Sequence, residues 1–349
     1  MKIDYLIAGQ GLAGSLIAWH LLAQGQRILV VDRDEDGTSS KVAAGLVTPI
    51  AGARFHLPDG LEERLNYARQ FYWDLEEAGA GTLFHHRRIA RLFQNEKEKA
   101  TWEQRMAIND SRYDRFVSPL VIDETFFRAN HGGFEMREGG WLDLPSFLEH
   151  TRISLLKSAS YAIGHIDAND IAIQPDGIQW KNITASKVIF CEGWRGNQNR
   201  FFDWVPMNPA LGDILEVTFP DLGNEERIIS RGGWIIPIAD GRYRVGSTYY
   251  HQSHPEPSLA DRRNAVLQKL HTITTASASV VHHLSAIRPV IRRSQIFMGI
   301  HPAHSSVAFF NGFGSKGVIN GPWHAKCLVD HLLQGLPLPP EADLRNNHF

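Results

Sequence analysis

Tyr5-Leu6-Ile7-Ala8-Gly9-Gln10-Gly11-Leu12-Ala13-Gly14 decides the fold of this chain, because an apolar run leads directly into a glycine-rich turn. The segment from Leu12 to Gln24 carries apolar residues at helical spacing, and a second apolar run follows from Arg27 to Asp32. Two strands joined through a helix in this way are parallel, and the crossover is nearly always right-handed. The opening therefore predicts an α/β domain with a parallel sheet.

Each glycine of the Gly9-x-Gly11-x-x-Gly14 spacing has a physical role. The first permits a tight turn, the second lets the backbone approach a pyrophosphate, and the third lets the helix pack on the strand. The helix N-terminus offers N–H groups to phosphates, and Asp32 ends the second strand where it can hold a ribose hydroxyl. The pattern predicts a dinucleotide site, with a purely structural turn as the alternative.

A second glycine-rich turn lies far along the chain. Asn311-Gly312-Phe313-Gly314-Ser315-Lys316-Gly317 follows the apolar run from Val307 to Phe310, and a helix is expected from Val318 to about Leu333. Two strand-to-helix turns favour a flavin held at both ends over a nicotinamide, which has no use for the second turn. A helix N-terminus or a cation near a reduced flavin stabilises its negative charge, so Lys316 is a candidate for that role. The alternative is a solvated loop lysine.

Size and charge narrow the class of protein. With 349 residues the chain is long enough for two domains, and its formal net charge of −2 lacks the basic excess typical of nucleic-acid binding. The two cysteines, Cys191 and Cys327, cannot form a disulfide framework. No leader and no bilayer-length apolar run is seen, so we expect a cytoplasmic protein without a transmembrane segment. The pairs His282-His283 and His301-x-x-His304 lack a completing ligand set, so no metal is expected.

The apolar pattern changes in the middle of the chain. From Ile214 to Tyr250 apolar residues alternate, and Asp240-Gly241 has the chemistry of a hairpin turn, which favours an antiparallel sheet. We expect two discontinuous domains: a nucleotide-binding domain of residues 1–80, 145–205 and 286–349, and a substrate-binding domain of residues 81–144 and 206–285.

Further segments complete a family pattern. They are Thr38-Ser39-Ser40-Lys41-Val42-Ala43-Ala44-Gly45-Leu46 and Ile287-Arg288-Pro289-Val290, with looser matches at residues 188–194 and 244–248. Together with the two glycine turns and Asp32, they resemble the D-amino acid oxidase and glycine oxidase family of FAD-dependent enzymes, which includes sarcosine oxidase. The resemblance implies a glutathione-reductase-type flavoprotein. Such a protein has a Rossmann-like FAD-binding domain with a parallel sheet and an α+β substrate domain built on an antiparallel sheet.

The resemblance also implies which residues hold FAD, without a covalent link because no cysteine or histidine stands at an obvious attachment position. It assigns the ADP half to Gly9, Gly11, Gly14 and Asp32, the pyrophosphate and ring to Thr38, Ser39, Ser40 and Leu46, and the pyrimidine edge to Gly314, Ser315, Lys316 and Gly317. Other residues expected in the same site are Leu12, Ala13, Arg33, Ala44, Gly45, Gly193, Trp194, Gly312 and Val318.

Arg288 is the expected partner of a substrate carboxylate, because a guanidinium matches a carboxylate with two parallel hydrogen bonds. The alternative places it in a surface cluster with Arg292 and Arg293. Tyr249 and Tyr250 are expected to line the substrate pocket and, with Arg288 and Lys316, complete the catalytic set. Weaker candidates, for which ordinary packing is the alternative, are Trp234, Arg54 and His251.

Some positions depart from the family pattern. Phe313 stands where many members have histidine, and Leu211-Gly212-Asp213 replaces a basic residue followed by glycine and Gln or Glu. These changes bear on the identity of the substrate more than on the reaction class.

The expected reaction is oxidation of the C–N bond of an amino acid or related amine. Hydride transfer to flavin N5 would give an imine that hydrolyses, and oxygen or another acceptor would re-oxidise the flavin. The alternatives are an NAD(P)-dependent dehydrogenase, a flavin enzyme acting on a larger amine such as a modified tRNA base, and a non-enzymatic flavoprotein.

Overall fold

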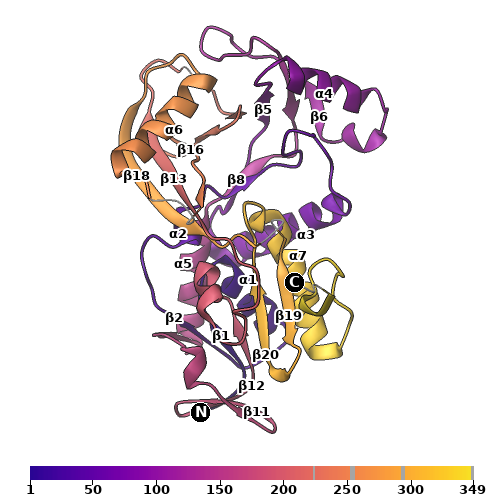
Figure 1. Cartoon of the computed structure of the whole chain (residues 1–349), viewed down its shortest axis with the longest axis vertical. Coiled ribbons are helices and arrows are strands. Elements are labelled where there is room, and N and C mark those ends of the chain that lie inside the picture. The colour runs from indigo at the N-terminus through magenta and orange to yellow at the C-terminus, as the bar shows by residue number, and fades with distance from the viewer. Residues whose placement is uncertain (223–224, 252–255, 292–294, 347–349) are drawn as a thin grey trace.

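The computed structural model describes residues 1–222, 225–251, 256–291 and 295–346 (Figure 1). Within them, one sheet of eight strands and one of nine strands account for most of the strand residues. In Figure 1 the first sheet occupies the lower half of the molecule, and strands β13, β16 and β18 of the second sheet stand in the upper half with helix α6.

The first sheet has a parallel core. β1 (Lys2–Ala8) pairs in parallel with β2 (Ile28–Asp32) on one side and with β12 (Ile183–Phe190) on the other. β12 in turn pairs in parallel with β20 (His304–Asn311). The remaining strands are β9 (Tyr161–Ile163), β10 (Ala172–Gln174), β11 (Gly177–Trp180) and β19 (Phe297–His301).

The order of these strands explains why the two glycine turns meet. β1 and β20 both pair with β12, with Ile7 opposite Ile189 and Ile189 opposite Ala308. Because all three strands are parallel, the turns after β1 and β20 open at the same carboxyl edge of the sheet, where ligands of open α/β sheets bind.

Four helices pack beside this sheet: α1 (Leu12–Ala23), α3 (Leu61–Leu75), α5 (Leu144–Lys157) and α7 (Gly317–Gln334). α1 contacts both α5 and α7, and α3 contacts α7. A Cβ atom at Gly321 would lie 2.6 Å from Leu16 Cδ1, so glycine there lets α7 approach α1 closely. α5 begins directly after Asp143, whose carboxylate accepts the N–H of Ser146.

The second sheet is mainly antiparallel, as the alternation predicts. Asp240 and Gly241 have φ of 60° and 66°, which is the left-handed geometry of the predicted hairpin turn. α6 (Leu259–Ile273) packs on this sheet and buries Val266 and Leu270. Its strands are β5 (Ile89–Leu92), β6 (Val117–Pro119), β7 (Gly133–Met136), β13 (Ala210–Thr218), β14 (Ile228–Ser230), β15 (Trp234–Pro237), β16 (Arg242–Gly246), β17 (Tyr250–His251) and β18 (Ser279–Arg288).

A small third sheet, which the sequence pattern did not predict, consists of β3 (Leu46–Val47), β8 (Gly140–Leu142) and β4 (Phe84–His86). The short helix α2 (Ser39–Val42) contacts both α5 and β18, so it lies between a helix beside the first sheet and a strand of the second. The other helical segments are α4 (Glu96–Met106), Glu76–Ala80, Ser111–Tyr113, Ala168–Asp170, Gly193–Gln198 and Leu344–Asn346.

The parallel sheet and the antiparallel sheet confirm the predicted architecture, whereas the residue boundaries of the two domains stay a prediction. Across the described residues, every helix is too short or too polar to cross a bilayer.

Candidate active site

Two connected cavities follow the carboxyl edge of the parallel sheet. The first has a volume of about 140 Å³ and the second about 370 Å³. Both are lined by Leu12, Ser39, Ser40, Pro289 and Phe313, so they adjoin each other.

The first cavity is built on the N-terminal glycine turn. Gly9, Gly11 and Ala13 line it, and Gly11, at the N-cap of α1, has no side chain with which to cap the helix. The N–H of Leu12 donates to Ser40 Oγ at 3.0 Å, which ties the turn to α2. A Cβ atom at Gly11 would lie 3.1 Å from the same Ser40 oxygen, so a side chain there would crowd the turn. This helix end is thus arranged to receive a phosphate.

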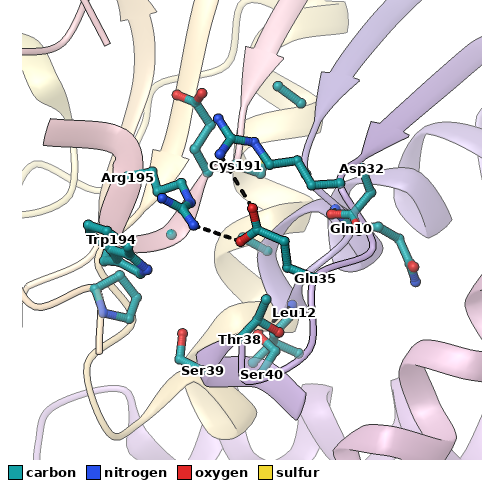
Figure 2. A pocket seen from close by; sticks show the side chains of 18 of the residues that line it. Gln10, Leu12, Asp32, Glu35, Thr38, Ser39, Ser40, Cys191, Trp194 and Arg195 are labelled. Carbon is teal, nitrogen blue, oxygen red and sulfur yellow. Dashed lines mark hydrogen bonds and ion pairs between the residues drawn. The ribbon is translucent and has the colours of Figure 1, made fainter. Parts of the chain in front are cut away.

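Asp32 also lines the first cavity, where Figure 2 shows it beside Gln10. One carboxylate oxygen accepts the N–H of Gln10 at 2.7 Å, and the other accepts the N–H of Asp34 at 2.8 Å. Each oxygen retains acceptor capacity. The carboxylate is therefore fixed in place and can still accept a ribose hydroxyl.

The sequence reasoning missed an ion-pair cluster on the same wall. Glu35 pairs with Arg195 at 2.7 Å and with Arg33 at 3.5 Å (Figure 2). The guanidinium of Arg195 lies 4.5 Å from the ring centroid of Trp194. Glu35 stands three residues beyond Asp32, so its place after the second strand was the available signal.

Glu192 is a second acidic group that the sequence reasoning did not select. It lines the first cavity and accepts a hydrogen bond from Asn199 Nδ2 at 2.7 Å. Burial raises the pKa of Glu192 to about 7, although the bond from Asn199 opposes the shift. Near neutral pH this carboxyl is therefore substantially protonated, which suits a cavity that receives phosphates.

The second cavity is built on the C-terminal glycine turn. Gly314, Ser315, Gly317 and Val318 line it, and no side chain caps the N-terminus of α7. Residues 42–46 form another part of its wall. Lys316 lines a third, adjacent cavity instead.

The two glycine turns touch each other. A Cβ atom at Gly317 would lie 2.9 Å from Leu12 Cδ2, so the start of α7 packs directly against the start of α1. The N-termini of α1 and α7 therefore open onto two adjoining cavities. This arrangement suits a long dinucleotide that carries a pyrophosphate near one end and a ring that becomes anionic at the other.

Arg288 enters the second cavity from the end of β18. Its Nη1 donates to the Thr248 carbonyl at 3.0 Å, and its Nη2 donates to Ser247 Oγ at 2.9 Å. The guanidinium lies 5.3 Å from the Tyr249 ring centroid. Burial lowers the pKa of Arg288, while Tyr249 and Asp213 act in the opposite direction. Its alternative partners, Arg292 and Arg293, lie outside the described residues.

The structure separates the two tyrosines predicted for the pocket. Tyr249 lines the second cavity, whereas Tyr250 belongs to β17 and is absent from both cavity walls in the described chain. Trp234 lines the second and third cavities. His251 packs edge-on against Tyr249, and Arg54 uses its backbone carbonyl to accept a bond from Arg105.

The other residues expected in the FAD site either line one of the two cavities or allow a turn beside them to form. Gly14 and Gly312 allow the close packing of their turns. A Cβ atom at Gly14 would lie 1.9 Å from the Gly9 carbonyl oxygen, and a Cβ atom at Gly312 would lie 2.5 Å from Ile291 Cδ1. Expected residues that line the first cavity, the second or both are Gly9, Gly11, Leu12, Ala13, Asp32, Arg33, Thr38, Ser39, Ser40, Ala44, Gly45, Leu46, Gly193, Trp194, Gly314, Ser315, Gly317 and Val318.

The histidine pairs belong to other environments. His283 Nε2 donates to Asp213 Oδ1 at 2.9 Å, and His301 stacks on His304 with ring centroids 4.8 Å apart. Within the described ranges, no three His, Cys, Asp or Glu residues come together as a metal site would require.

Comparison with known proteins names the family. The family model described as DAO, FAD dependent oxidoreductase, matches residues 4–331. The chain belongs to this family. FAD is therefore the cofactor, and the two helix N-termini and the glycine turns described above fit it.

Individual relatives are distant. Glycine oxidase of Pseudomonas putida is 21% identical over 361 residues, which cover 97% of this chain and 96% of that protein. The tRNA 5-methylaminomethyl-2-thiouridine biosynthesis bifunctional protein MnmC of Cupriavidus metallidurans is 23% identical and covers 97% of this chain, which spans only 57% of that protein. The crystal structure of glycine oxidase from Geobacillus kaustophilus superposes with a TM-score of 0.82 at 17% identity, covering 99% of this chain and 100% of that one. At such identities the likeness establishes the fold.

Proposed function

We propose that this flavoprotein oxidises the carbon–nitrogen bond of an amino acid or related amine that carries a carboxylate. The observation that supports this proposal is the placement of Arg288 in the wall of the second cavity. Its hydrogen bonds within the described chain go to a carbonyl and a hydroxyl, neither of which neutralises its charge.

A carboxylate would complete this site. The bonds from Nη1 and Nη2 of Arg288 fix the plane of the guanidinium and leave further N–H donors for a ligand. Because burial lowers the pKa of Arg288, the site favours an anion that restores the stability of the charged form. An amino acid held there by its carboxylate would present its α-carbon and its amine to the rest of the cavity.

FAD, when bound, supplies the acceptor for the hydride that leaves the carbon next to the amine. The protein contributes position and exclusion of water, because Leu46, Leu144, Ile214 and Val318 line the same cavity. Burial raises the pKa of Tyr249, so this phenol stays protonated at neutral pH. Arg288 and Tyr249 are the titratable side chains among the described residues lining this cavity, so none is available as a general base. The amine must therefore react in its neutral form.

Anaerobic reduction of the bound flavin tests the proposal. We expect one class among glycine, D-amino acids, sarcosine and other secondary amines to bleach the flavin absorbance, faster at higher pH as the amine loses its proton. Arg288→Gln should weaken substrate binding by about a hundredfold, because a charge-assisted bidentate contact is lost, while FAD stays bound. If no amine bleaches the flavin and Arg288→Gln changes no ligand affinity, the proposal is wrong.

A larger amine is the second candidate. Two observations favour it: the third cavity adjoins the second, and several relatives are named for tRNA 5-methylaminomethyl-2-thiouridine biosynthesis. Bleaching by an amine-modified tRNA and by none of the small amino acids would support this candidate over the first.

A further inference from the structure

A third cavity of about 380 Å³ adjoins the second. The two share Leu46, Trp234, Ser247 and Ser315 in their walls. Ser247 is also the hydroxyl that accepts a bond from Arg288. The third cavity therefore borders the part of the second cavity that holds the Arg288 guanidinium.

Two of the charged groups in the wall of the third cavity neutralise each other. Arg91 pairs with Glu98 at 3.0 Å, and both residues are less than a tenth exposed. Glu98 also accepts bonds from the backbone N–H and the side-chain amide of Gln94, each at 2.8 Å. Its oxygens are therefore occupied, and this pair contributes little net charge.

Lys316 is different, because no acidic partner is found for it among the described residues. It precedes the uncapped N-terminus of α7 and lines the third cavity. Lys316 as a whole is exposed, but partial burial of its ammonium group and the nearby guanidinium of Arg64 both lower its pKa. Arg64 uses its own donors on Asn320 Oδ1 and on the Asp59 carbonyl. The cavity thus has an excess of positive charge at Lys316, next to a helix end that also attracts anions.

We propose that the third cavity is a second anion subsite, in which Lys316 binds a carboxylate or similar acidic group at the far end of an elongated amine substrate. This inference rests on the proposed function, since it assumes that the near carboxylate lies on Arg288. It narrows the substrate class to amines that carry two acidic groups. It also replaces the sequence-based expectation that Lys316 faces the pyrimidine edge of the flavin.

Binding of carboxylates that cannot be oxidised tests the subsite on the FAD-loaded protein. The probes are straight-chain monocarboxylates from acetate to hexanoate and dicarboxylates from malonate to adipate, each titrated by its perturbation of the flavin absorbance. We expect one dicarboxylate of suitable length to bind about tenfold or more tightly than the monocarboxylate of equal carbon number, because it gains a charge-assisted contact. Lys316→Gln should abolish that advantage and leave monocarboxylate affinity unchanged.

Two further variants make the result specific. Lys316→Arg keeps the charge and should restore most of the advantage. Lys326→Gln removes a charge on the same helix, from a residue paired with Asp330 and outside all three cavity walls, and should have no effect.

Two results would contradict the proposed anion subsite. If dicarboxylates bind no better than monocarboxylates at any length, the subsite does not exist. If Lys316→Gln weakens both series equally, or shifts the reduction potential of the flavin, Lys316 acts on the ring instead. Arg288→Gln separates the two proposals, since the carboxylate site of the proposed function fails if this variant weakens neither series.

Discussion

Gly212 lies directly beneath the guanidinium of Arg288. A Cβ atom at position 212 would come within 2.2 Å of Arg288 Nη1 and 2.4 Å of its Cζ and Nη2. The two residues lie on neighbouring antiparallel strands, β13 and β18. The position of the guanidinium in the second cavity therefore depends on the absence of a side chain at position 212.

We expect Gly212→Ala to lower the affinity for carboxylate ligands by about tenfold or more, because the added methyl group displaces the guanidinium from its bonds to Ser247 and Thr248. The fold should persist, since the clash is with the end of a flexible side chain. Titration of acetate by flavin absorbance measures the loss. Leu211→Ala, which changes the adjacent residue outside both cavity walls, is the control. Unchanged acetate affinity in Gly212→Ala would show that Arg288 does not bind the carboxylate.

The second prediction concerns Asp213, which is fully buried on the other face of the same strand. It accepts bonds from Thr248 Oγ1 at 2.7 Å and Ser285 Oγ at 2.6 Å, and it pairs with Arg262 at 3.2 Å. Asp213→Asn should lower the free energy of unfolding by about 3 kcal/mol, because it leaves a buried cation poorly compensated. Urea unfolding measures this change.

The matched control for Asp213→Asn acts on the same arginine. Glu256 is an exposed partner of Arg262 at 3.4 Å, so Glu256→Gln should cost less than about 1 kcal/mol. Equal effects of the two substitutions would contradict the role given to Asp213. Because the carbonyl of Thr248 accepts from Arg288, Asp213→Asn should also weaken acetate binding.

The third prediction is a pH dependence at Glu192. Its pKa is raised from 4.5 to about 7, so the folded state favours the protonated carboxyl. Stability from this group is fully present below about pH 4.5 and is lost as the pH rises through about 7. Glu192→Gln cannot ionise, so it should be more stable than the natural protein at pH 8.5 by about 1–2 kcal/mol and no more stable at pH 4.5.

Thermal unfolding of the FAD-bound protein at several pH values measures the effect at Glu192. Glu149→Gln, at an exposed glutamate, should follow the natural protein throughout. A difference between Glu192→Gln and the natural protein that does not change with pH would contradict the prediction.

The fourth prediction compares Gly14, in helix α1, with Gly164, which follows β9 and lines the first cavity. A Cβ atom at Gly14 would lie 1.9 Å from the Gly9 carbonyl oxygen, whereas at Gly164 its nearest neighbour would be Val31 Cγ1 at 3.5 Å. Gly14→Ala should therefore abolish FAD retention or destabilise the protein by about 3 kcal/mol or more, because backbone must move. Gly164→Ala should retain FAD. The ratio of flavin to protein absorbance after purification measures both, and equal retention would refute the prediction.

Local patterns in the sequence were sufficient for the architecture. The periodicity of the first strands, the spacing of Gly9, Gly11 and Gly14, and the Asp240-Gly241 turn each depend on a few neighbouring residues. The alternation of side chains along an extended segment also indicates that two adjacent residues cannot both line the same cavity. Since Tyr249 and Tyr250 are adjacent, their side chains point to opposite sides, and only one was able to line the cavity.

Contacts between segments that are distant in the sequence could not be predicted from such local patterns. The position of Gly212 under Arg288 depends on the register of β13 against β18. The pair formed by Glu35 and Arg195 joins residues 160 positions apart. Lys316 lines the third cavity because of how α7 packs on α1, which a turn motif does not specify.

β12 lies between one strand from the beginning of the chain and another from near its end. β1 comprises residues 2–8, and β20 comprises residues 304–311. During translation the edge that holds the dinucleotide is complete only after β20 has left the ribosome, so nascent chains stalled before residue 304 should not capture FAD. Cofactor loading then requires that β20 has already been synthesised.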